Sequence, residues 1–329
     1  MATARMSSCR GRPASSRDRG SNVIDMSEAA FVGVDWGTSS FRLWVLSLEG
    51  APLASSRSNE GMQHCTVAGF RPVLEQHLQT VGVPDALPVL VCGMAGARQG
   101  WVEAEYAHTP TPLGDLHARA ISVPDAGRDV RILPGVAQVS AEAPNVMRGE
   151  ETQLLGAIDE GFTGLVCMPG THCKWVSVKN GSVMEFSTFM TGELFSVIGK
   201  HSILMHGIEP GEAPTFDDPG VSSAIALVRE DASALMSALF SIRAGQLLGF
   251  ETKAQGAAHL SGLLIGAEIS AAKKQYGAVG RIVLIGSGAL GNLYEAALTD
   301  AGFSVSTIDA EEAVRSGLAK AAARIWEKE

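Results

Sequence analysis

Residues 31–40 read FVGVDWGTSS, a short apolar strand that runs directly into a polar turn. The strand ends at Asp35, and Gly37, Thr38 and Ser39 follow in the turn. Glycine lets a backbone approach an anion closely, and consecutive backbone N–H groups in such a turn form an anion-binding concavity. The two hydroxyls add donors, and a carboxylate such as Asp35 is a ligand that Mg²⁺ accepts directly or through water. The segment therefore predicts a phosphate-binding hairpin with a metal-binding carboxylate at its base.

The same pattern returns in the second half of the chain. Residues 165–174 read LVCMPGTHCK, so an apolar strand again precedes a turn, here Gly170-Thr171 followed by His172 and Lys174. In both places a further strand and a glycine-containing turn come next, which is typical of an antiparallel meander. The repetition predicts two similar lobes whose turns hold one triphosphate from both sides. The alternative is a chance similarity of two ordinary hairpins.

A glycine-rich loop follows the predicted strand 281–285. Residues 286–291 read GSGALG before a predicted helix, and the next strand ends at Asp309. This pattern is close to the fingerprint of a dinucleotide-binding fold. Only about 20 residues follow Asp309 in this sequence, whereas that fold needs further strand–helix units. We therefore expect Gly286 and Gly288 to lie against an adenosine.

Two carboxylates, Glu150 and Glu151, begin a predicted helix that runs from about Arg148 to Gly161. The helix dipole stabilises anions at this end, and a base that accepts a hydroxyl proton must be ionised. Either glutamate is thus a candidate base, although glutamate also favours first helical turns for stability alone. Arg148 is a candidate ligand for an acidic substrate.

Small residues on two predicted helices permit close helix crossing. Gly156 follows the glutamate pair, and Gly262 and Gly266 share a face of the predicted helix 260–274. At a junction of two lobes such faces would form a hinge that closes on substrate, and elsewhere they would serve tight core packing.

The composition excludes several classes of function. Hydrophobic residues make up 46% and charged residues 19% of 329 residues, which is enough for about two domains with sizeable cores. The net charge of −9 argues against a nucleic-acid partner, and no apolar run approaches the roughly 20 residues that span a membrane. The five cysteines form no C-x-x-C pair, so we expect reduced thiols, no zinc site and a cytoplasmic location.

The chain divides into three predicted parts. Residues 1–26 are rich in arginine, serine and glycine, which predicts a disordered extension, or an organellar transit peptide. Residues 27–160 form the first predicted lobe and residues 161–329 the second. We expect the C-terminal helix, residues 310–326, to return to the first lobe.

The order of these motifs resembles that of the actin–hexokinase–Hsp70 superfamily of ATP-binding proteins. In that pattern a first phosphate loop and a connecting helix precede a second phosphate loop, a second connecting helix and an adenosine loop. Four longer phrases resemble the 2-dehydro-3-deoxygalactonokinase family more specifically. They are NVMRGEETQLLGA (145–157), MPGTHCKWV (168–176), MTGEL (190–194) and LSGLLIGAEI (260–269). The similarity covers nearly the whole chain from Phe31 onward.

The resemblance implies an α/β fold of two ribonuclease-H-like lobes with ATP in the cleft between them. It implies transfer of the γ-phosphoryl group of ATP to the 6-hydroxyl of 2-dehydro-3-deoxy-D-galactonate in galactonate breakdown, with Mg²⁺ as cofactor. The residues that it assigns to the phosphates and nucleotide are Gly37, Thr38, Ser39, Gly170, Thr171, His172, Lys174, Gly286 and Gly288. Asp35 would serve Mg²⁺, and Glu150 or Glu151 would be the base.

The resemblance also implies a sugar-acid pocket along the loop from Gly93 to Trp101. Gly93, Met94, Arg98 and Trp101 would line it, and Arg148, Lys174 or Arg98 would hold the substrate carboxylate. The expected partner is therefore a small sugar acid, with the chain as a monomer or homodimer. Two alternatives remain at this point: a kinase of the same fold that acts on another small sugar or amino sugar, and a non-enzymatic nucleotide switch of the actin kind.

Overall fold

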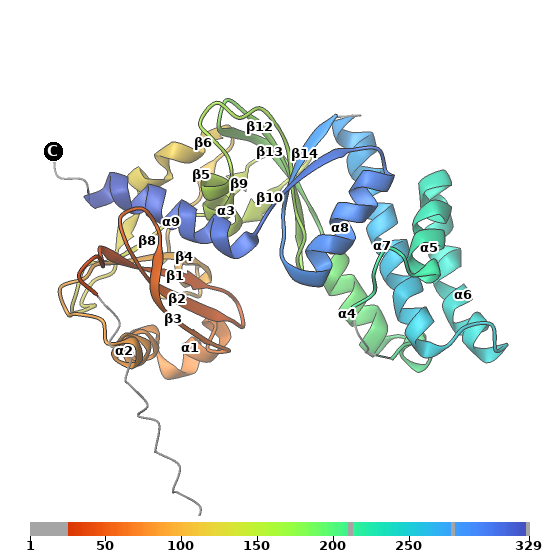
Figure 1. Cartoon of the computed structure of the whole chain (residues 1–329), viewed down its shortest axis with the longest axis horizontal. Coiled ribbons are helices and arrows are strands. Elements are labelled where there is room, and N and C mark those ends of the chain that lie inside the picture. Colours follow the sequence, from red (N-terminus) through yellow and green to blue (C-terminus); the bar gives the residue numbers. More distant parts are fainter. Residues whose placement is uncertain (1–25, 210–212, 278–279, 327–329) are drawn as a thin grey trace, which may run out of the picture.

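The computed structural model describes residues 26–209, 213–277 and 280–326 (Figure 1). The predicted extension lies outside these ranges, apart from its last residue. Within the described part, no helix combines the length and the apolar character that crossing a membrane requires.

The first sheet begins with the predicted meander. Strands β1 (Phe31–Trp36), β2 (Phe41–Leu46) and β3 (Pro52–Ser58) pair antiparallel. Strand β4 (Val89–Gly93) adds parallel to β1, followed by β8 (Val130–Ile132) and β7 (Ile121–Ser122), in the order β3-β2-β1-β4-β8-β7. Every residue of β1 is buried because helices cover both faces of the sheet.

The second sheet repeats this arrangement. Strands β11 (Gly164–Met168), β12 (Cys173–Lys179) and β13 (Ser182–Phe189) form the meander, and β14 (Arg281–Ile285) and β15 (Ser304–Ile308) add parallel to β11. The strand order is β15-β14-β11-β12-β13-β6. The edge strand β6 (Thr111–Pro112) comes from the first half of the chain, so residues before position 161 contribute to this sheet.

Short elements connect the first sheet to the central helices. A small sheet has the order β10-β9-β5, with β5 (Ala107–His108), β9 (Val136–Gln138) and β10 (Asn145–Met147). Two 3₁₀ segments occur in this part of the chain. The segment η1 (Met94–Gly96) comes before β5, and η2 (Leu113–Arg119) comes between β5 and β9. Strand β10 leads directly to the helix that carries the glutamate pair.

Helices α3 (Glu150–Ala157) and α9 (Ala310–Trp326) lie between the two sheets (Figure 1). Val314 and Leu318 of α9 pack against Phe31 of the first sheet, and Ala313 packs with Leu154 of α3 in the core of the second. The two helices cross at Gly156 and Gly317, where an added Cβ would lie 1.9 Å from a backbone oxygen of the other helix. Glycine is therefore required on both sides of this crossing.

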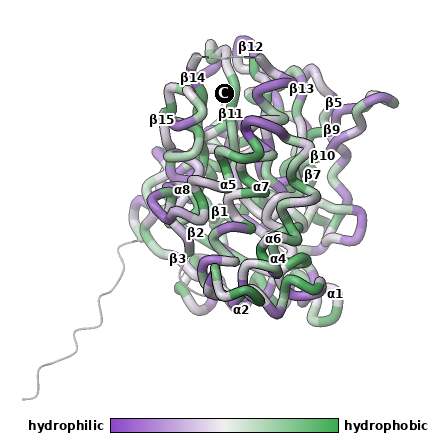
Figure 2. The backbone as a smooth tube through the Cα atoms, turned by 90° about the vertical axis from the view of Figure 1, so that its right-hand side faces the viewer, coloured by the Kyte–Doolittle hydropathy of each residue, from purple (hydrophilic) through white to green (hydrophobic). Residues whose placement is uncertain are grey.

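The outer faces of the two sheets have different covers. Helices α1 (Met62–Ala68) and α2 (Phe70–Val81) lie beside the first sheet, where Phe70, Leu74 and Leu78 pack under β1. The second sheet packs on α7 (Lys253–Tyr276) and α8 (Gly288–Asp300). Further helices α4 (Thr191–His201), α5 (Pro219–Glu230) and α6 (Leu235–Leu247), with the short η3 (Ile203–His206) and η4 (Ala232–Ala234), extend this lobe, and α4 and α6 are hydrophobic along much of their length (Figure 2).

The glycines of α7 lie elsewhere than at the expected hinge. Gly262 and Gly266 do not lie at a junction of the lobes, because they pack against Val221 and Ile225 of α5 inside the second lobe. Of the small-residue sites singled out in the sequence, Gly156 is the one at the crossing between the two sheets. The shared strand order of the two sheets confirms the predicted pair of ribonuclease-H-like lobes of the actin-like ATPase fold.

Candidate active site

The first Gly-Thr turn is fixed by the helix that follows its meander. The Gly37 N–H donates to the Ser40 carbonyl over 2.8 Å and closes the turn. The Gly37 and Thr38 carbonyls accept from the N–H groups of Met62 and Gln63 in the first turn of α1, over 2.9 and 3.1 Å. The side chains of Thr38 and Ser39 are exposed. Hydrogen bonds to α1 therefore fix the backbone of the turn, and its Thr38 and Ser39 side chains face solvent.

The second Gly-Thr turn is supported in the same way by α4. The Glu193 N–H donates to the Thr171 carbonyl over 3.0 Å, and an added Cβ at Gly192 would lie 2.6 Å from the Gly170 oxygen. The His172 imidazole pairs with the Glu193 carboxylate, and both side chains are exposed in part. His172 thus contacts α4, and Thr171 faces solvent.

Asp35 lies at the base of the first turn and faces a cation on the next strand. Asp35 and Arg42 are cross-strand partners, and Arg42 NH2 lies 3.0 Å from Asp35 Oδ2. Burial raises the pKa of Asp35, Arg42 opposes this shift, and the charges of Glu150 and Glu311 add to it. Asp35 is therefore within electrostatic reach of the first turn of α3.

Glu150 in the first turn of α3 contacts the second hairpin. Its Oε1 lies 3.2 Å from Nζ of Lys174, the buried residue at the start of β12, and its Oε2 accepts from the Arg148 N–H over 2.9 Å. About a quarter of the Glu150 side chain is exposed. One carboxylate thus lies between the ends of both hairpins, which brings Asp35, Glu150 and Lys174 together.

Glu151 has a different environment from its neighbour. It is 0% exposed, and both of its oxygens accept from the Gly149 N–H over 2.8 and 2.9 Å. Burial, together with the nearby charge of Glu150, raises its pKa to about 8. At neutral pH Glu151 is mostly a neutral acid enclosed by protein.

The loop after β4 lies against the first turn of α3. Gly93 adopts φ +88°, and the Cβ that Gly149 lacks would contact its Cα at 3.4 Å. Met94 is partly exposed. The loop ends at Trp101, whose ring stacks on Phe70 with centroids 6.0 Å apart and therefore packs with the core of the first lobe.

Two arginines near this loop differ in their surroundings. Arg148 lies under the loop: its NH2 donates to the Ala104 carbonyl over 2.9 Å, and its guanidinium stacks on Tyr106 at 4.3 Å. Its Nε and NH1 are buried without a partner in the described structure. Arg98 is exposed and makes no ion pair or side-chain hydrogen bond with the described residues. Arg98 is thus exposed without an ion pair among the described residues, whereas Arg148 is partly buried and keeps two unpaired donors.

A cavity of about 550 Å³ opens beside the second Gly-Thr turn. Gly170 and Thr171 line one end, and α4, α7 and α8 provide the walls. Most of its exposed lining is apolar, including Phe195, Leu264 and Leu290. Such a cavity suits a flat, largely apolar group attached to a phosphate chain.

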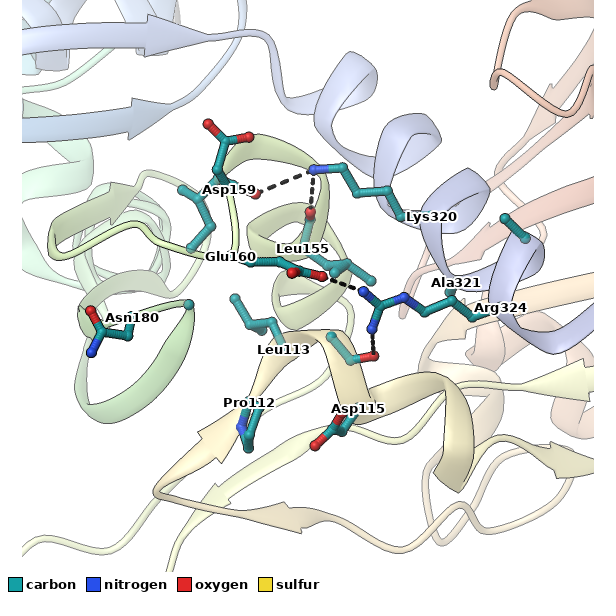
Figure 3. Close-up of a pocket in the computed structure, with 14 residues that line it drawn as sticks. Pro112, Leu113, Asp115, Leu155, Asp159, Glu160, Asn180, Lys320, Ala321 and Arg324 are labelled. Carbon is teal, nitrogen blue, oxygen red and sulfur yellow. Dashed lines mark hydrogen bonds and ion pairs between the residues drawn. The ribbon is translucent and has the colours of Figure 1, made fainter. Parts of the chain in front are cut away.

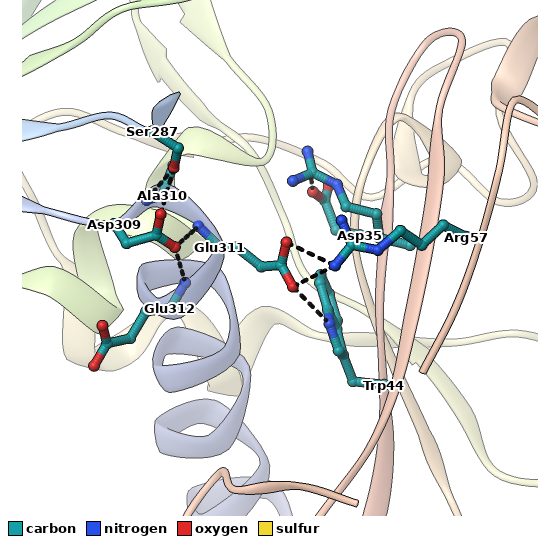
Figure 4. Close-up of polar contacts among 9 residues, drawn as sticks. Asp35, Trp44, Arg57, Ser287, Asp309, Ala310, Glu311 and Glu312 are labelled. Atoms are coloured by element: carbon teal, nitrogen blue, oxygen red, sulfur yellow. Dashed lines mark hydrogen bonds and ion pairs between the residues drawn. The ribbon is translucent and has the colours of Figure 1, made fainter. Parts of the chain in front are cut away.

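The predicted adenosine loop borders this cavity. Gly286 precedes α8 and Gly288 is its first residue, and the next two residues, Ala289 and Leu290, line the cavity. Asp309, considered above as the acid of a dinucleotide fold, instead begins α9: it accepts from the N–H groups of Glu311 and Glu312 over 3.0 Å and from the Ser287 hydroxyl (Figure 4). The dinucleotide interpretation is therefore wrong.

A second cavity, about 780 Å³, lies away from both hairpins (Figure 3). It is formed where α3 ends, and Lys320 of α9 donates there to the carbonyls of Leu155, Gly156 and Ile158. Asp115, Asp159 and Glu160 also line it. Carboxylates and a helix C-terminus disfavour a triphosphate, and Lys320 and Arg324 on the same wall already bind carbonyl and carboxylate oxygens.

Several residues at the site were not predicted from the sequence. Arg42 was missed, although its register opposite Asp35 follows from the length of the first turn. Glu311 was missed as well: it lies in the first turn of α9 and accepts from Arg57 and from the Trp44 indole N–H of the first sheet (Figure 4). Lys200, on the wall of the smaller cavity, had no signal in the sequence because α4 was not predicted.

Comparisons with known proteins agree with this geometry. The model of the 2-keto-3-deoxy-galactonokinase family matches residues 35–321. A Rhizobium meliloti protein named as a probable 2-dehydro-3-deoxygalactonokinase is 50% identical over 90% of this chain and 97% of its own length. The Escherichia coli 2-dehydro-3-deoxygalactonokinase is 32% identical over 88% of this chain and 96% of its own length.

A solved structure supports the same assignment. A candidate 2-dehydro-3-deoxygalactonokinase from Sinorhizobium meliloti superposes with a TM-score of 0.85 at 50% identity, covering 91% of this chain and all of that one. The family match, the two relatives and the shared fold together show that the chain belongs to the 2-keto-3-deoxy-galactonokinase family.

Proposed function

We propose that this protein transfers the γ-phosphoryl group of ATP to the 6-hydroxyl of 2-dehydro-3-deoxy-D-galactonate, as a step of galactonate breakdown. Family membership supports the reaction and the substrate class. One structural observation carries the proposal: Glu150 pairs with Lys174 of the second hairpin and acts electrostatically on Asp35 of the first. A carboxylate so placed can serve a hydroxyl that attacks a phosphoryl group held between the hairpins.

In this proposal the nucleotide lies between a first lobe, residues 27–160, and a second lobe, residues 161–329. The turns at Gly37-Thr38-Ser39 and Gly170-Thr171 hold its phosphates through backbone N–H and hydroxyl groups. The adenosine occupies the 550 Å³ cavity, next to Gly286 and Gly288. Donors fixed before binding need no reorganisation, which favours the developing charge of the transferred group.

We assign the base to Glu150 and not to Glu151. A general base must come within hydrogen-bond reach of the proton that it accepts. Glu150 is partly exposed, and Lys174 and the Arg148 N–H hold its carboxylate in position. Glu151 is fully enclosed, and its raised pKa of about 8 leaves it mostly protonated at neutral pH. Glu151 instead fixes the first turn of α3 through the Gly149 N–H.

Asp35 fits the Mg²⁺ that the reaction requires. Mg²⁺ prefers carboxylate oxygens and keeps several waters, so one buried carboxylate beside an open phosphate turn suits it. The raised pKa of Asp35 is a consequence of burial near other acids, a situation that a cation relieves. When bound, the ion would neutralise charge on the phosphates. Arg42 holds Asp35 in place over 3.0 Å.

The sugar acid is placed along the loop that begins at Gly93 and Met94. Arg98 is our candidate for its carboxylate, because this guanidinium is exposed and has no competing partner among the described residues. Arg148 supports the loop from below through Ala104, and Trp101 anchors its end in the core.

The four described cysteines are free, which supports a reducing compartment such as the cytoplasm.

The proposal is tested by assaying purified protein with ATP, Mg²⁺ and a panel of sugar acids that includes 2-dehydro-3-deoxy-D-galactonate, its C4 epimer and several amino sugars. We expect ADP release with the galactonate derivative, and a product that carries phosphate on O6 by ³¹P NMR. Faster turnover of an amino sugar, or no ADP above background with any sugar acid, would contradict the proposal.

A further inference from the structure

A buried carboxylate in the second lobe has no role in the reaction described so far. Glu268 lies in the middle of α7, within the LSGLLIGAEI phrase, and is 3% exposed. A carboxyl group away from water is costly unless hydrogen-bond donors surround it: burial raises the pKa of Glu268, and its hydrogen bonds oppose that shift. Glu268 has three such donors, and each comes from a different structural element.

The three donors lie on β12, α8 and α4, and all three bind the carboxyl group of Glu268. The Trp175 indole N–H donates to Glu268 Oε1 over 2.8 Å, and the Tyr294 hydroxyl donates to Oε2 over 2.8 Å. The Thr191 hydroxyl donates to the same Oε2. Each of these hydrogen bonds satisfies a buried polar group that would be costly to leave unpaired, so this network fixes all three elements relative to α7.

Two of these donors belong to the proposed nucleotide site. Thr191 and Tyr294 both line the 550 Å³ cavity. Thr191 is also the first residue of α4, and the next two residues contact the second Gly-Thr turn: Gly192 packs on the Gly170 carbonyl, and the Glu193 N–H donates to Thr171. The position of the turn therefore depends on the position of Thr191.

The network does not need a metal ion to explain it. The Sγ atoms of Cys167 and Cys173 and a carboxylate oxygen of Glu268 lie within 4.8 Å of one another. Burial raises the pKa of both thiols, so they are protonated at neutral pH. The Glu268 oxygens already accept three hydrogen bonds from protein donors, which satisfies the buried carboxyl group.

We propose that Glu268 is a positioning residue for ATP: through Thr191 it holds the first turn of α4 against the Gly170-Thr171 turn, and through Tyr294 it fixes the opposite wall of the adenosine cavity. The inference rests on the proposed function in placing ATP at this site. Glu268 itself touches no substrate, and it acts by keeping the nucleotide site formed before ATP arrives.

A double-mutant cycle tests the coupling between Glu268 and Thr191. The variants are Thr191→Val, Glu268→Gln and the pair, with Thr191→Ser as the conservative change that keeps the hydroxyl. The control is Tyr276→Phe, because Tyr276 lies on the same helix and its hydroxyl donates to the Trp175 carbonyl over 3.1 Å and to the Ser187 hydroxyl over 2.9 Å, not to a residue of α4. ATP affinity is measured by calorimetry on the full chain, and the KM for the sugar acid is measured in parallel.

We expect Thr191→Val and Glu268→Gln each to weaken ATP binding about tenfold, the loss typical of one buried hydrogen bond. The double variant should lose no more than either single one, and the KM for the sugar acid should stay unchanged. Thr191→Ser and Tyr276→Phe should bind ATP like the wild type.

The inference is overturned if Thr191→Val binds ATP normally, if the two losses multiply to about 100-fold, or if Tyr276→Phe loses as much. Failure of the proposed function gives a different result, because ATP would then bind and respond to these variants while no sugar acid is phosphorylated. Thr191→Val keeps the test decisive if Glu268→Gln does not fold.

Discussion

The two Gly-Thr hairpins have the same backbone plan but opposite chemistry at their bases. In the first, the residue two positions before the glycine is Asp35, and its cross-strand partner is Arg42. In the second, the same positions hold Met168 and Lys174. Arg42 therefore has a carboxylate on its own sheet, whereas Lys174 has none and instead pairs with Glu150 of α3.

This difference shows how a repeated unit can serve two purposes. The hairpin with an internal carboxylate is equipped to hold a cation beside the phosphates, and its charge is balanced locally. The hairpin without one has a lysine that pairs with Glu150, the base that we propose. Both turns keep the same support, a following helix whose backbone N–H groups bind the turn carbonyls.

Removing the base should have the largest effect. Glu150→Gln keeps the shape of the side chain but cannot accept a proton, so we expect kcat to fall by about 10²–10⁴-fold with little change in ATP affinity. Glu151→Gln is the matched control, because Glu151 is mostly protonated near neutral pH and should lose less than tenfold. Steady-state kinetics measures kcat for both variants. A larger loss of kcat in Glu151→Gln than in Glu150→Gln would assign the base to Glu151.

Removing the carboxylate that distinguishes the first hairpin should have the next largest effect. Asp35→Asn should lower kcat about 100-fold and raise the Mg²⁺ concentration needed for half-maximal activity, because charge stabilisation of this kind is worth about 10²–10³. Arg42→Lys keeps both charges and should need Mg²⁺ like the wild type. A Mg²⁺ titration checks this, and an unchanged Mg²⁺ requirement in Asp35→Asn would separate Asp35 from the metal.

The strands and turns of both hairpins could be predicted because their signals are local. Apolar runs of four to six residues, glycine turns and the Asn180-Gly181 hairpin fix these elements without reference to the rest of the chain. The start of α5 had a local signal too, Asp218 followed by Pro219, which the sequence interpretation overlooked.

The site could be predicted only in part because its contacts are not local. Sequence made Arg148 a candidate for the substrate carboxylate, but it could not show that the Arg148 guanidinium stacks on Tyr106 under the loop. It could not separate Glu150 from Glu151, because adjacent residues on a helix point in different directions and only packing decides which is buried. The wall of the proposed nucleotide cavity brings α4 together with α7 and α8, and helices α5 and α6 separate α4 from these two in the chain.

Glu151, the buried neighbour of Glu150, should make the free energy of unfolding depend on pH. The folded pKa of Glu151, about 8, exceeds its ordinary value of 4.5, so the folded protein keeps a proton that the unfolded chain has released. The resulting stability is complete below about pH 4.5 and is lost as the pH rises toward 8. Glu151→Gln carries no such proton.

From pH 5.5 to 7, the free energy of unfolding of the wild type should therefore fall by about 2 kcal/mol relative to that of Glu151→Gln, at about 1.4 kcal/mol per pH unit. Urea unfolding at four pH values measures this difference. Parallel curves for the two proteins would show that Glu151 is ionised in the fold.

Replacing Arg98, the exposed cation of the loop from Gly93 to Trp101, should have the smallest effect. Arg98→Ala should raise the KM for the sugar acid about tenfold and leave the KM for ATP unchanged, since a solvent-accessible charge pair contributes little more than about 1 kcal/mol. Arg119→Ala, which removes the same charge from an exposed position on η2, is the control. Equal values for the two variants would exclude Arg98 from carboxylate binding.

The central claim is that both hairpins hold one nucleotide. Amide hydrogen exchange, followed by mass spectrometry with and without a non-hydrolysable ATP analogue and Mg²⁺, tests it directly. We predict slower exchange in peptides that cover Gly37–Ser40 and Gly170–Thr171 at the same ligand concentration, and loss of the protection in both when Glu268 is replaced by glutamine at subsaturating analogue. Protection of only one of the two turns at saturation would contradict the account.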